Sequence, residues 1–360
     1  MDVGLYVSAD TSSQFHVPHG RFPIRRARSA VPILVGGLVL VLGIVNRTRV
    51  SSVAQSIGAM RLGALAVLSG LIAVHRSVNA LMHRASVDGV SFPQMIVATE
   101  AHVGACHTII GGAGIGTGLR IAMLRSWGVD PIGVSVAVIL TSIVPSFAMW
   151  VIAGAQTIPL MVVGEAGLIE RSVAIASVAA VGASLSVVAW VLISDRAPLA
   201  GHRVYVRIFE VLHRSTPRLG RAIQGRLPGN PLLAAQAIQG RSRSVLRRNG
   251  VFLVISAIAA QLLLALTLVV CASAVAPHAA LPIVSLLRTF ALLRVLSAFV
   301  PIPGGLGIVD VGLVGSLQTA GLDSTHAIAA VALYRSVTFV LPIVTGPICT
   351  AIWWVRTGRH

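Results

Sequence analysis

Apolar residues form long runs along this chain, and polar residues gather between the runs. Each run approaches or exceeds the roughly 20 apolar residues that an α-helix needs to cross a bilayer. Strand-like alternation is weak and Leu, Ala, Val and Gly are abundant, which favours helices over a β-barrel. The runs lie near residues 30–46, 57–75, 91–110, 130–153, 172–194, 250–273, 282–302 and 324–353. We therefore predict an all-α polytopic membrane protein with about eight full spans.

Two glycine-led segments, 111–128 and 303–321, lie between apolar runs and are only moderately apolar. Their glycines are Gly111, Gly112 and Gly114 in the first segment and Gly304, Gly305 and Gly307 in the second. Irregular backbone is tolerated at membrane depth only where protein or a wet cavity covers it. We predict that both segments are short broken or re-entrant half-helices.

The two glycine-led segments are copies of one pattern. The run Gly111–Ile115 returns as Gly304–Ile308, 193 residues later, and the match continues without a gap. Later matches are Leu124 with Leu317, Gly128 with Gly321, and Asp130 with Asp323. Internal duplication in an apolar chain is typical of transporters, whose site lies between the repeats. A Gly- and Ala-rich composition would also produce part of this match.

Composition agrees with a membrane protein. Hydrophobic residues make up 55% of the 360 residues, charged residues 11%, and the mean hydropathy is +0.87. A water-soluble fold of this length would need more charge to cover its surface. The net charge of +17 rests on arginine, because the chain has no lysine.

Arginine also predicts the orientation. Basic residues cluster before the first apolar run, in the central stretch and after the last run. By the positive-inside bias, all three clusters face the cytoplasm. The predicted segments are a basic cytoplasmic N-terminus (1–29), a first membrane half (30–195), a basic cytoplasmic loop with an interfacial helix (196–249), a second membrane half (250–353) and a cytoplasmic tail (354–360).

This orientation constrains the number of crossings. Five runs precede the central loop and three come after it, yet each half must begin and end inside. If 111–128 and 303–321 also cross, both counts become even and the halves are inverted repeats. If these segments only dip in and return, one arginine cluster lies outside. We favour inverted repeats.

Ionisable side chains in the membrane part are the candidate site residues. Each costs roughly 2.5–3.5 kcal/mol at bilayer depth, so it usually faces a partner or a cavity. They are Glu100, Arg120, Arg288, Arg294, Asp310 and Arg335, with His102 and His107 nearby. The surplus of arginine suits an anion, because guanidinium groups match phosphate oxygens, and helix N-termini after Gly112 and Gly305 would add backbone N–H groups.

A purely structural explanation is also open. Arg335 would then pair with Asp310 or Glu100 to fix helix packing, while Arg288 and Arg294 would reach an interface. We expect no metal site and no cofactor, since His102 and His107 lack a metal-ligand pattern and the three cysteines lack CxxC spacing. The chain contains no HExxH, GxSxG or Walker motif, and no recognised nucleic-acid-binding fold accompanies its basic loop.

The second glycine-led segment carries a family resemblance. Val300–Asp310, V-P-I-P-G-G-L-G-I-V-D, resembles the P-x-P-G-G-x-G-x-x-E/D signature of the flippase-like transmembrane region of lysylphosphatidylglycerol synthases, the multiple peptide resistance factors. Leu333–Arg335, Leu341-Pro342 and Gly346 match the positions downstream of this signature in that family, and the glycine run before Arg120 looks like its first-half motif. The resemblance extends over about residues 30–353.

Two features depart from the family pattern. The full synthases carry a soluble aminoacyl-transferase domain after the membrane region, whereas this chain ends at His360, so we expect it not to be an enzyme. Asp310 replaces a commoner glutamate, and the first half has His107–Ile110 in place of Pro-x-Pro.

The resemblance implies a bacterial plasma (inner) membrane protein with cytoplasmic termini that moves a phospholipid or lipid-linked anionic head group between leaflets. Arg335 and Arg120 would contact phosphate, while Asp310 and Glu100 would hold these arginines or meet a cationic head group. The six glycines would let backbone approach the ligand and bend. The expected partners are anionic lipids and a second copy of the chain or a cell-envelope enzyme, and no nucleic acid. An ion-coupled carrier of a small soluble anion and a non-transporting scaffold are alternatives.

Overall fold

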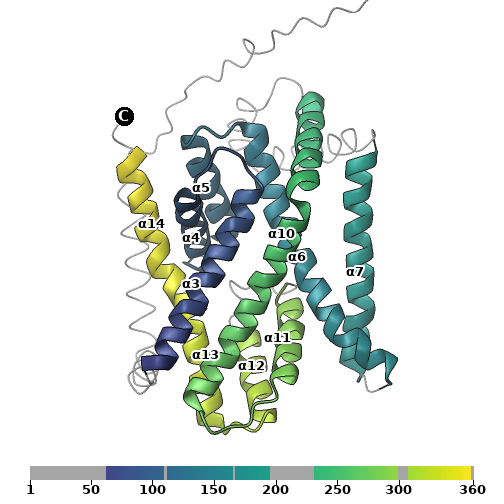
Figure 1. Ribbon diagram of the computed structural model, residues 1–360, viewed down its shortest axis with the longest axis vertical. Coiled ribbons are helices and arrows are strands. Elements are labelled where there is room, and N and C mark those ends of the chain that lie inside the picture. The colour runs from purple at the N-terminus through teal and green to yellow at the C-terminus, as the bar shows by residue number, and fades with distance from the viewer. Residues whose placement is uncertain (1–61, 109–111, 165–166, 195–230, 299–306, 358–360) are drawn as a thin grey trace, which may run out of the picture.

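The computed structural model describes residues 62–108, 112–164, 167–194, 231–298 and 307–357, and these residues form helices and turns without a strand. The apolar run at 30–46 lies outside them. The helices (Figure 1) are α3 (Leu62–Ala85), α4 (Phe92–Thr108), α5 (Gly112–Ser126), α6 (Pro131–Val162), α7 (Leu168–Ile193), α10 (Pro231–Val275), α11 (Ile283–Ala298), α12 (Ile308–Thr319), α13 (Ser324–Arg335) and α14 (Leu341–Thr357), with a π-helical turn at Ser336–Val340 between the last two.

Five helices in the described part are long and apolar enough to cross a membrane: α3, α6, α7, α10 and the continuous α13–α14. The predicted number of about eight full spans is not confirmed. Helices α4 and α11, which occupy the runs at 91–110 and 282–302, have 17 and 16 residues. At 1.5 Å per residue each is only about 25 Å long, shorter than a typical hydrocarbon core.

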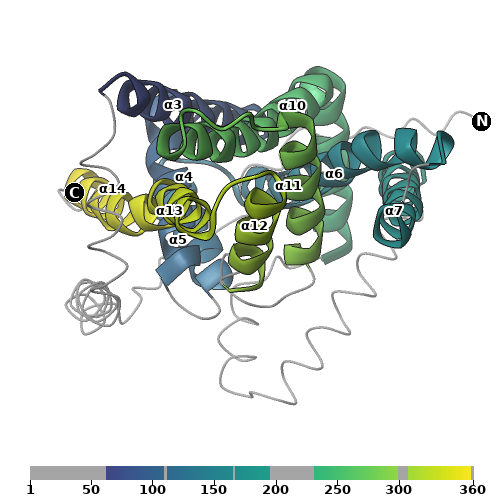
Figure 2. The same cartoon turned by 90° about the horizontal axis from the view of Figure 1, so that it is seen from below.

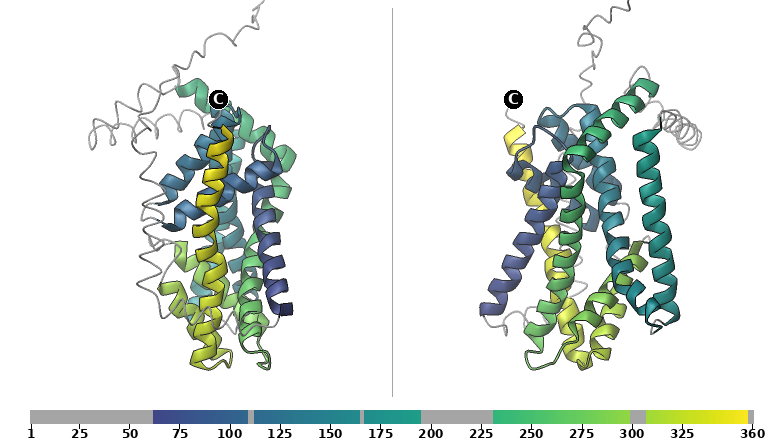
Figure 3. Two further views of the ribbon diagram at one scale, coloured as in Figure 1. Left: turned by 90° about the vertical axis from the view of Figure 1, so that its left-hand side faces the viewer. Right: turned by 45° about the vertical axis from the view of Figure 1, so that its right-hand side comes forward.

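Each of these short helices instead pairs with the glycine-led helix that comes next in the chain. Helix α5 runs back along α4, because Gly112 packs against Ala105 and Cys106 while Gly116 packs against His102. Helix α12 likewise packs against α11, the helix that precedes it in the chain, with Gly312 against Leu293. The α4–α5 pair lies in the upper half of Figure 1 and the α11–α12 pair in the lower half, and α5 and α12 lie on the same side of α14 in the left panel of Figure 3.

Equivalent long helices run in opposite directions. Helix α3 ascends in Figure 1 whereas α10 descends, and α6 descends whereas α13–α14 ascends. Two candidate spans, α10 and α13–α14, lie between the start of α10 and the end of α14, because α11 and α12 are each too short to be counted. This even number does not require the segment 303–321 to cross.

The matched residues of the two glycine-led segments build the same turn twice. Gly128 and Gly321 have positive φ angles of 86° and 97°. The next residue donates its N–H to the carbonyl of Leu124 at 3.1 Å in one copy and to that of Leu317 at 3.0 Å in the other. This pattern ends a helix with glycine in the left-handed conformation.

The helix after each of these turns also begins in the same way. Asp130 caps α6 by accepting the N–H of Gly133, and Asp323 caps α13 by accepting those of Thr325 and His326. A side-chain oxygen at the N-cap satisfies backbone donors that the helix itself leaves unpaired. The repeat seen in the sequence is therefore also a repeat of helix ends and helix starts.

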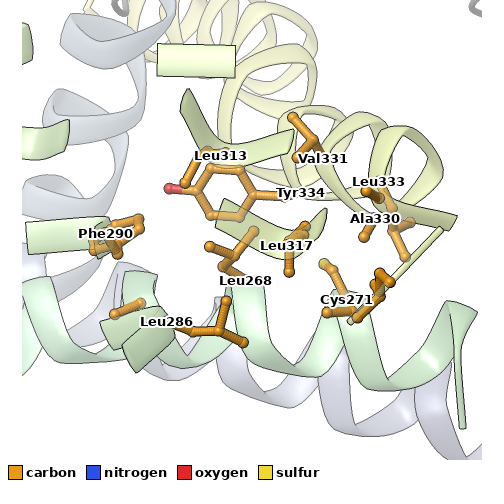
Figure 4. Close-up of a cluster of buried hydrophobic side chains, with 14 of the residues drawn as sticks. Leu268, Cys271, Leu286, Phe290, Leu313, Leu317, Ala330, Val331, Leu333 and Tyr334 are labelled. Carbon is orange, nitrogen blue, oxygen red and sulfur yellow. The ribbon is translucent and has the colours of Figure 1, made fainter. Parts of the chain in front are cut away.

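The largest buried cluster joins α10 to the second set of short helices. Figure 4 shows Leu268 of α10, Leu286 of α11, Leu313 and Leu317 of α12, and Tyr334 of α13 packed together. Seen from below (Figure 2), α3 and α10 lie side by side and α7 stands at the periphery next to α6. The core thus holds the α11–α12 hairpin against the spanning helices.

Helix α10 has 45 residues and is about 67 Å long, so its N-terminal part extends beyond the membrane-spanning length. Residues 231–249 of the predicted cytoplasmic loop are therefore helical and continuous with the span. Arg241 and Arg248 in this part form ion pairs with Asp88 after α3, and Arg241 also lies 3.7 Å from Asp130. The interfacial helix expected earlier in that loop lies outside the described residues.

Candidate functional site

The first charged pair joins the α11–α12 hairpin to α13. Arg335 donates from Nε to Asp310 Oδ1 at 2.5 Å, and both side chains are largely buried. Arg335 is the last residue of α13, directly before the π-helical turn. Pro342 has no N–H to donate to Thr338, and within this turn Leu341 bonds to Ser336, five residues back. Such turns occur frequently at functional sites.

Asp310 also caps the N-terminus of α12. Its second carboxylate oxygen accepts the backbone N–H of Gly307 at 2.9 Å, and Gly307 has a φ of +90°, which favours glycine. A carboxylate in the first turn is stabilised by the positive end of the helix dipole. The start of α12 is therefore occupied by the protein's own carboxylate, whereas the sequence predicted an N-terminus open to an anion.

The second charged pair joins the α4–α5 hairpin to α3. Glu100 of α4 forms an ion pair with Arg76 of α3, and it also accepts the hydroxyl of Thr345 in α14 at 2.7 Å. Only 8% of Glu100 is exposed. From the sequence we expected Glu100 to hold one of the candidate arginines and missed Arg76, because its apolar run ended one residue earlier. The interruption of the apolar α3 sequence by Arg76 was the available signal.

Helices α4 and α14 approach each other closely below this pair. A Cβ atom at Gly104 would lie 2.8 Å from the Cα of Gly346, so the two backbones touch. Further along, the ring of His107 stacks on Phe339 with centroids 4.6 Å apart. The stack connects the end of α4 to the π-helical turn after Arg335.

His107 lies amid three guanidinium groups. Arg76, Arg294 and Arg335, from α3, α11 and α13, are all close enough to act electrostatically on its ring. His107 Nδ1 is buried and has no hydrogen-bond partner among the described residues. Arginine side chains from α3, α11 and α13 therefore gather around the end of α4.

Arg120 does not join this group. It is 4% exposed, donates to Thr141 Oγ1 at 3.0 Å, and acts on His83, His102 and Cys106 rather than on His107. Of the candidate arginines, Arg335 and Arg294 therefore lie near His107 together with Arg76, whereas Arg120 lies near a different group of side chains.

The predicted glycines have different roles where the structure describes them. Gly112 packs against the backbone of α4, since a Cβ atom there would lie 2.3 Å from the Ala105 carbonyl oxygen. Gly114 faces open space, and Gly307 supplies the positive φ at the start of α12. Gly111, Gly304 and Gly305 lie outside the described residues. Close helix packing thus accounts for Gly112 without a ligand.

Charge is unbalanced across the membrane part. Apart from Asp130 at the start of α6, the apolar runs and glycine-led segments contain only two carboxylates, Glu100 and Asp310, and both are paired with arginine. Arg120, Arg288 and Arg294 each keep a buried Nε without a hydrogen-bond partner in the described part of the chain. Within those ranges, no group of three His, Cys, Asp or Glu side chains gathers as a metal site would require.

Comparison with known proteins identifies the family. Residues 29–346 match the family model of the lysylphosphatidylglycerol synthase TM region. A search among curated proteins found no match to the chain. The matched part includes all the charged pairs described above and every helix from α3 to the start of α14. The chain therefore belongs to the family of the lysylphosphatidylglycerol synthase transmembrane region.

Proposed function

We propose that this protein is flippase-like and moves a phospholipid or lipid-linked anionic head group between the leaflets of the bacterial plasma membrane. The observation that carries the proposal is the charged region between the hairpins. Each hairpin contributes one carboxylate, the buried Glu100 or the partly buried Asp310, and each carboxylate pairs with an arginine of a spanning helix. Ionisable groups at bilayer depth are costly, so their retention favours a substrate path.

We further propose that α3–α6 and α10–α14 are inverted-topology repeats. Their matched helices run in opposite directions, and their matched turns share backbone geometry. In transporters built in this way, the site lies near the bilayer midplane where the repeats meet. The meeting point of the hairpins, around His107, is the corresponding place in this chain.

The cytoplasmic side is proposed to be the upper end in Figure 1. The N-terminal part of α10, which carries Arg241 and Arg248, and the C-terminal end of α14, which carries Arg356, lie at that end, whereas α6 ends and α7 begins at the other. Arginine accumulates on the cytoplasmic side of membrane proteins. With one further span at 30–46, the N-terminus, the central loop and the C-terminus share this side.

Movement of the head group would proceed through an exchange of ionic partners. An arriving phosphate competes with Asp310 for Arg335, because a guanidinium group binds phosphate and carboxylate oxygens alike. Gly307 and the π-helical turn beside this pair are the positions where α12 and α13–α14 would bend. The proposed activity involves no covalent chemistry, and its partners are anionic lipids.

A leaflet-specific lipid assay tests this function. Purified protein is reconstituted into vesicles with fluorescent phosphatidylglycerol, and the fraction reached by an impermeant quencher is measured over time. We expect faster exchange than in protein-free vesicles, and slower exchange with Arg335→Ala or Asp310→Ala. Arg247→Ala, which removes an exposed charge on α10, is the matched control.

Two results would oppose the proposal. Exchange no faster than in protein-free vesicles would exclude lipid movement under these conditions. Uptake of a water-soluble anion without lipid exchange would favour the soluble-anion carrier instead.

A further inference from the structure

Arg294 of α11 has no counter-charge among the described residues. Its side chain is partly buried, its Nε is buried without a hydrogen-bond partner in the described part of the chain, and no described carboxylate lies within ion-pair distance of it. The undescribed segment 299–306 after α11 contains no acidic residue. A charge partly removed from water without a partner is unfavourable, so the position calls for an explanation.

Arg294 lines a small cavity between three helices. Gln156 of α6, Gln261 of α10 and Phe290 of α11 line the same cavity, whose volume is about 10 Å³. That volume accommodates roughly one water molecule. The other lining side chains are apolar, and Gln156 Nε2 donates one hydrogen to the Leu287 carbonyl oxygen at 3.4 Å. The guanidinium and the remaining amide N–H groups favour an occupant that accepts hydrogen bonds.

The other charges around Arg294 are already engaged. Arg76 is paired with Glu100, and Arg335 is paired with Asp310. Arg294 acts electrostatically on His75, His107 and Tyr334, so it belongs to the region between the hairpins. It is therefore the guanidinium of this region whose charge no carboxylate of the described chain offsets.

We propose that Arg294 binds the phosphate of the transported molecule, with Gln156 and Gln261 as further hydrogen-bonding groups of the same site. The proposal rests on the proposed function and names a residue of that site that takes the anion in addition to Arg335. A phosphodiester of a lipid head group and inorganic phosphate share the required chemistry.

Binding requires the cavity to open, because a phosphate group is larger than one water molecule. Helices α6 and α11 meet there through the small buried residues Ala153 and Ala291. Helix α11 belongs to the short hairpin and does not itself span, so a displacement of the hairpin away from α6 would enlarge the cavity.

A thermal-shift experiment on the full-length protein in an uncharged detergent tests Arg294. The probes are short-chain phosphatidylglycerol, inorganic phosphate and an uncharged short-chain diacylglycerol. We expect the first two, or one of them, to raise the unfolding temperature of the wild type, and the uncharged lipid to have no such effect. Arg294→Gln should weaken the apparent affinity by about tenfold or more, the effect of losing one charge-assisted hydrogen bond or more. Arg247→Gln is the control for loss of one positive charge.

A second measurement separates binding from a structural role. Without ligand, Arg294→Gln should unfold at the same temperature as the wild type or at a higher one, because it removes a partly buried charge that has no described counter-charge. A lower unfolding temperature would mean that Arg294 has a structural partner, and it would overturn the proposal.

The outcomes distinguish the ligand source and the two proposals. A shift with phosphatidylglycerol alone supports a lipid head group, and a shift with inorganic phosphate alone supports a free anion at the same residue. No shift in the wild type, or an equal shift in Arg294→Gln, overturns the role of Arg294. If the role of Arg294 is overturned, lipid exchange in vesicles would still support the flippase-like function. Binding at Arg294 without lipid exchange would overturn that function but would still support an anion site at Arg294.

Discussion

Gly104 of α4 and Gly346 of α14 pack backbone against backbone. A Cβ atom added to Gly104 would lie 2.5 Å from the Pro342 carbonyl oxygen and 2.8 Å from the Cα of Gly346. These atoms belong to the backbone, so a flexible side chain cannot move aside to make room. Small residues at helix interfaces allow this approach in membranes. The contact places Glu100 beside Thr345 on the same two helices.

Gly104→Ala should therefore destabilise the protein. We expect a loss of about 1–3 kcal/mol, as is common for overpacking, because α4 must move away from α14. Thermal unfolding in detergent measures the effect. Gly118→Ala in α5 is the matched control, since its Cβ atom meets open space and alanine favours a helix. Equal unfolding temperatures for Gly104→Ala and the wild type would contradict the close contact.

A double-mutant cycle should detect coupling between Asp310 and Arg335. Asp310→Asn and Arg335→Gln each leave one charge without its partner, and we expect each to cost about 1–3 kcal/mol in this partly exposed pair. The double variant should cost less than the sum of the two single variants. Additive losses would show that the pair contributes nothing beyond its separate side chains.

The cap on α12 can be separated from this ion pair. Asn keeps an oxygen that can accept the Gly307 N–H, whereas Ala removes it. Asp310→Ala should therefore be less stable than Asp310→Asn by about 1 kcal/mol, the usual value of an N-terminal cap. Equal stability of the two variants would argue against the hydrogen bond to Gly307. The comparison uses thermal unfolding of both variants in one detergent.

Arg76, which the sequence pattern did not reveal, should matter as much as Glu100. Arg76→Gln leaves the buried carboxylate with only the Thr345 hydroxyl as a described partner, so stability and lipid exchange should both fall. Combining it with Glu100→Gln should restore part of the stability, because no charge is then left unpaired. Arg356→Gln near the end of α14 removes the same charge and serves as the control. A double variant less stable than either single variant would contradict this pairing.

The sequence predicted the repeated elements well because their signals are local. Gly128 and Gly321 need a left-handed backbone, and Asp130 and Asp323 supply helix caps, so these positions mark helix boundaries before any tertiary contact is known. Family membership was likewise visible in the residues around Asp310.

The pairing of the short helices into hairpins could not be predicted from hydropathy. An apolar run of the length of α4 has the same composition whether it crosses the bilayer or turns back halfway. The hairpin arises from tertiary packing, where Gly112 and Gly116 contact α4. Composition does not report which helix a glycine will face.

The pairing of the charged side chains also could not be predicted from the sequence. The sequence left Arg335 to pair with Asp310 or with Glu100, and the structure pairs it with Asp310. Glu100 and Arg76 lie on consecutive helices, and nothing local in the sequence links them. Arg120 shares the same residue type and hydropathy as Arg335 but faces Thr141 and a different set of helices. Only the three-dimensional arrangement separates the two arginines.

The opposite orientation of the hairpins makes a final prediction. Arg125 at the end of α5 and Gln318 at the end of α12 are exposed and lie 193 residues apart, at matched positions of the two repeats. In a variant whose three native cysteines are replaced by alanine, Arg125→Cys should react with a membrane-impermeant maleimide only from the cytoplasmic side. Gln318→Cys should react only from the outside. Protein that is unfolded or inserted in both orientations would react from both sides of the membrane. Labelling of the same cysteine variants in detergent gives the maximum reactivity for comparison. Labelling of both positions from one side would rule out inverted repeats, since equivalent hairpin ends would then share a membrane surface.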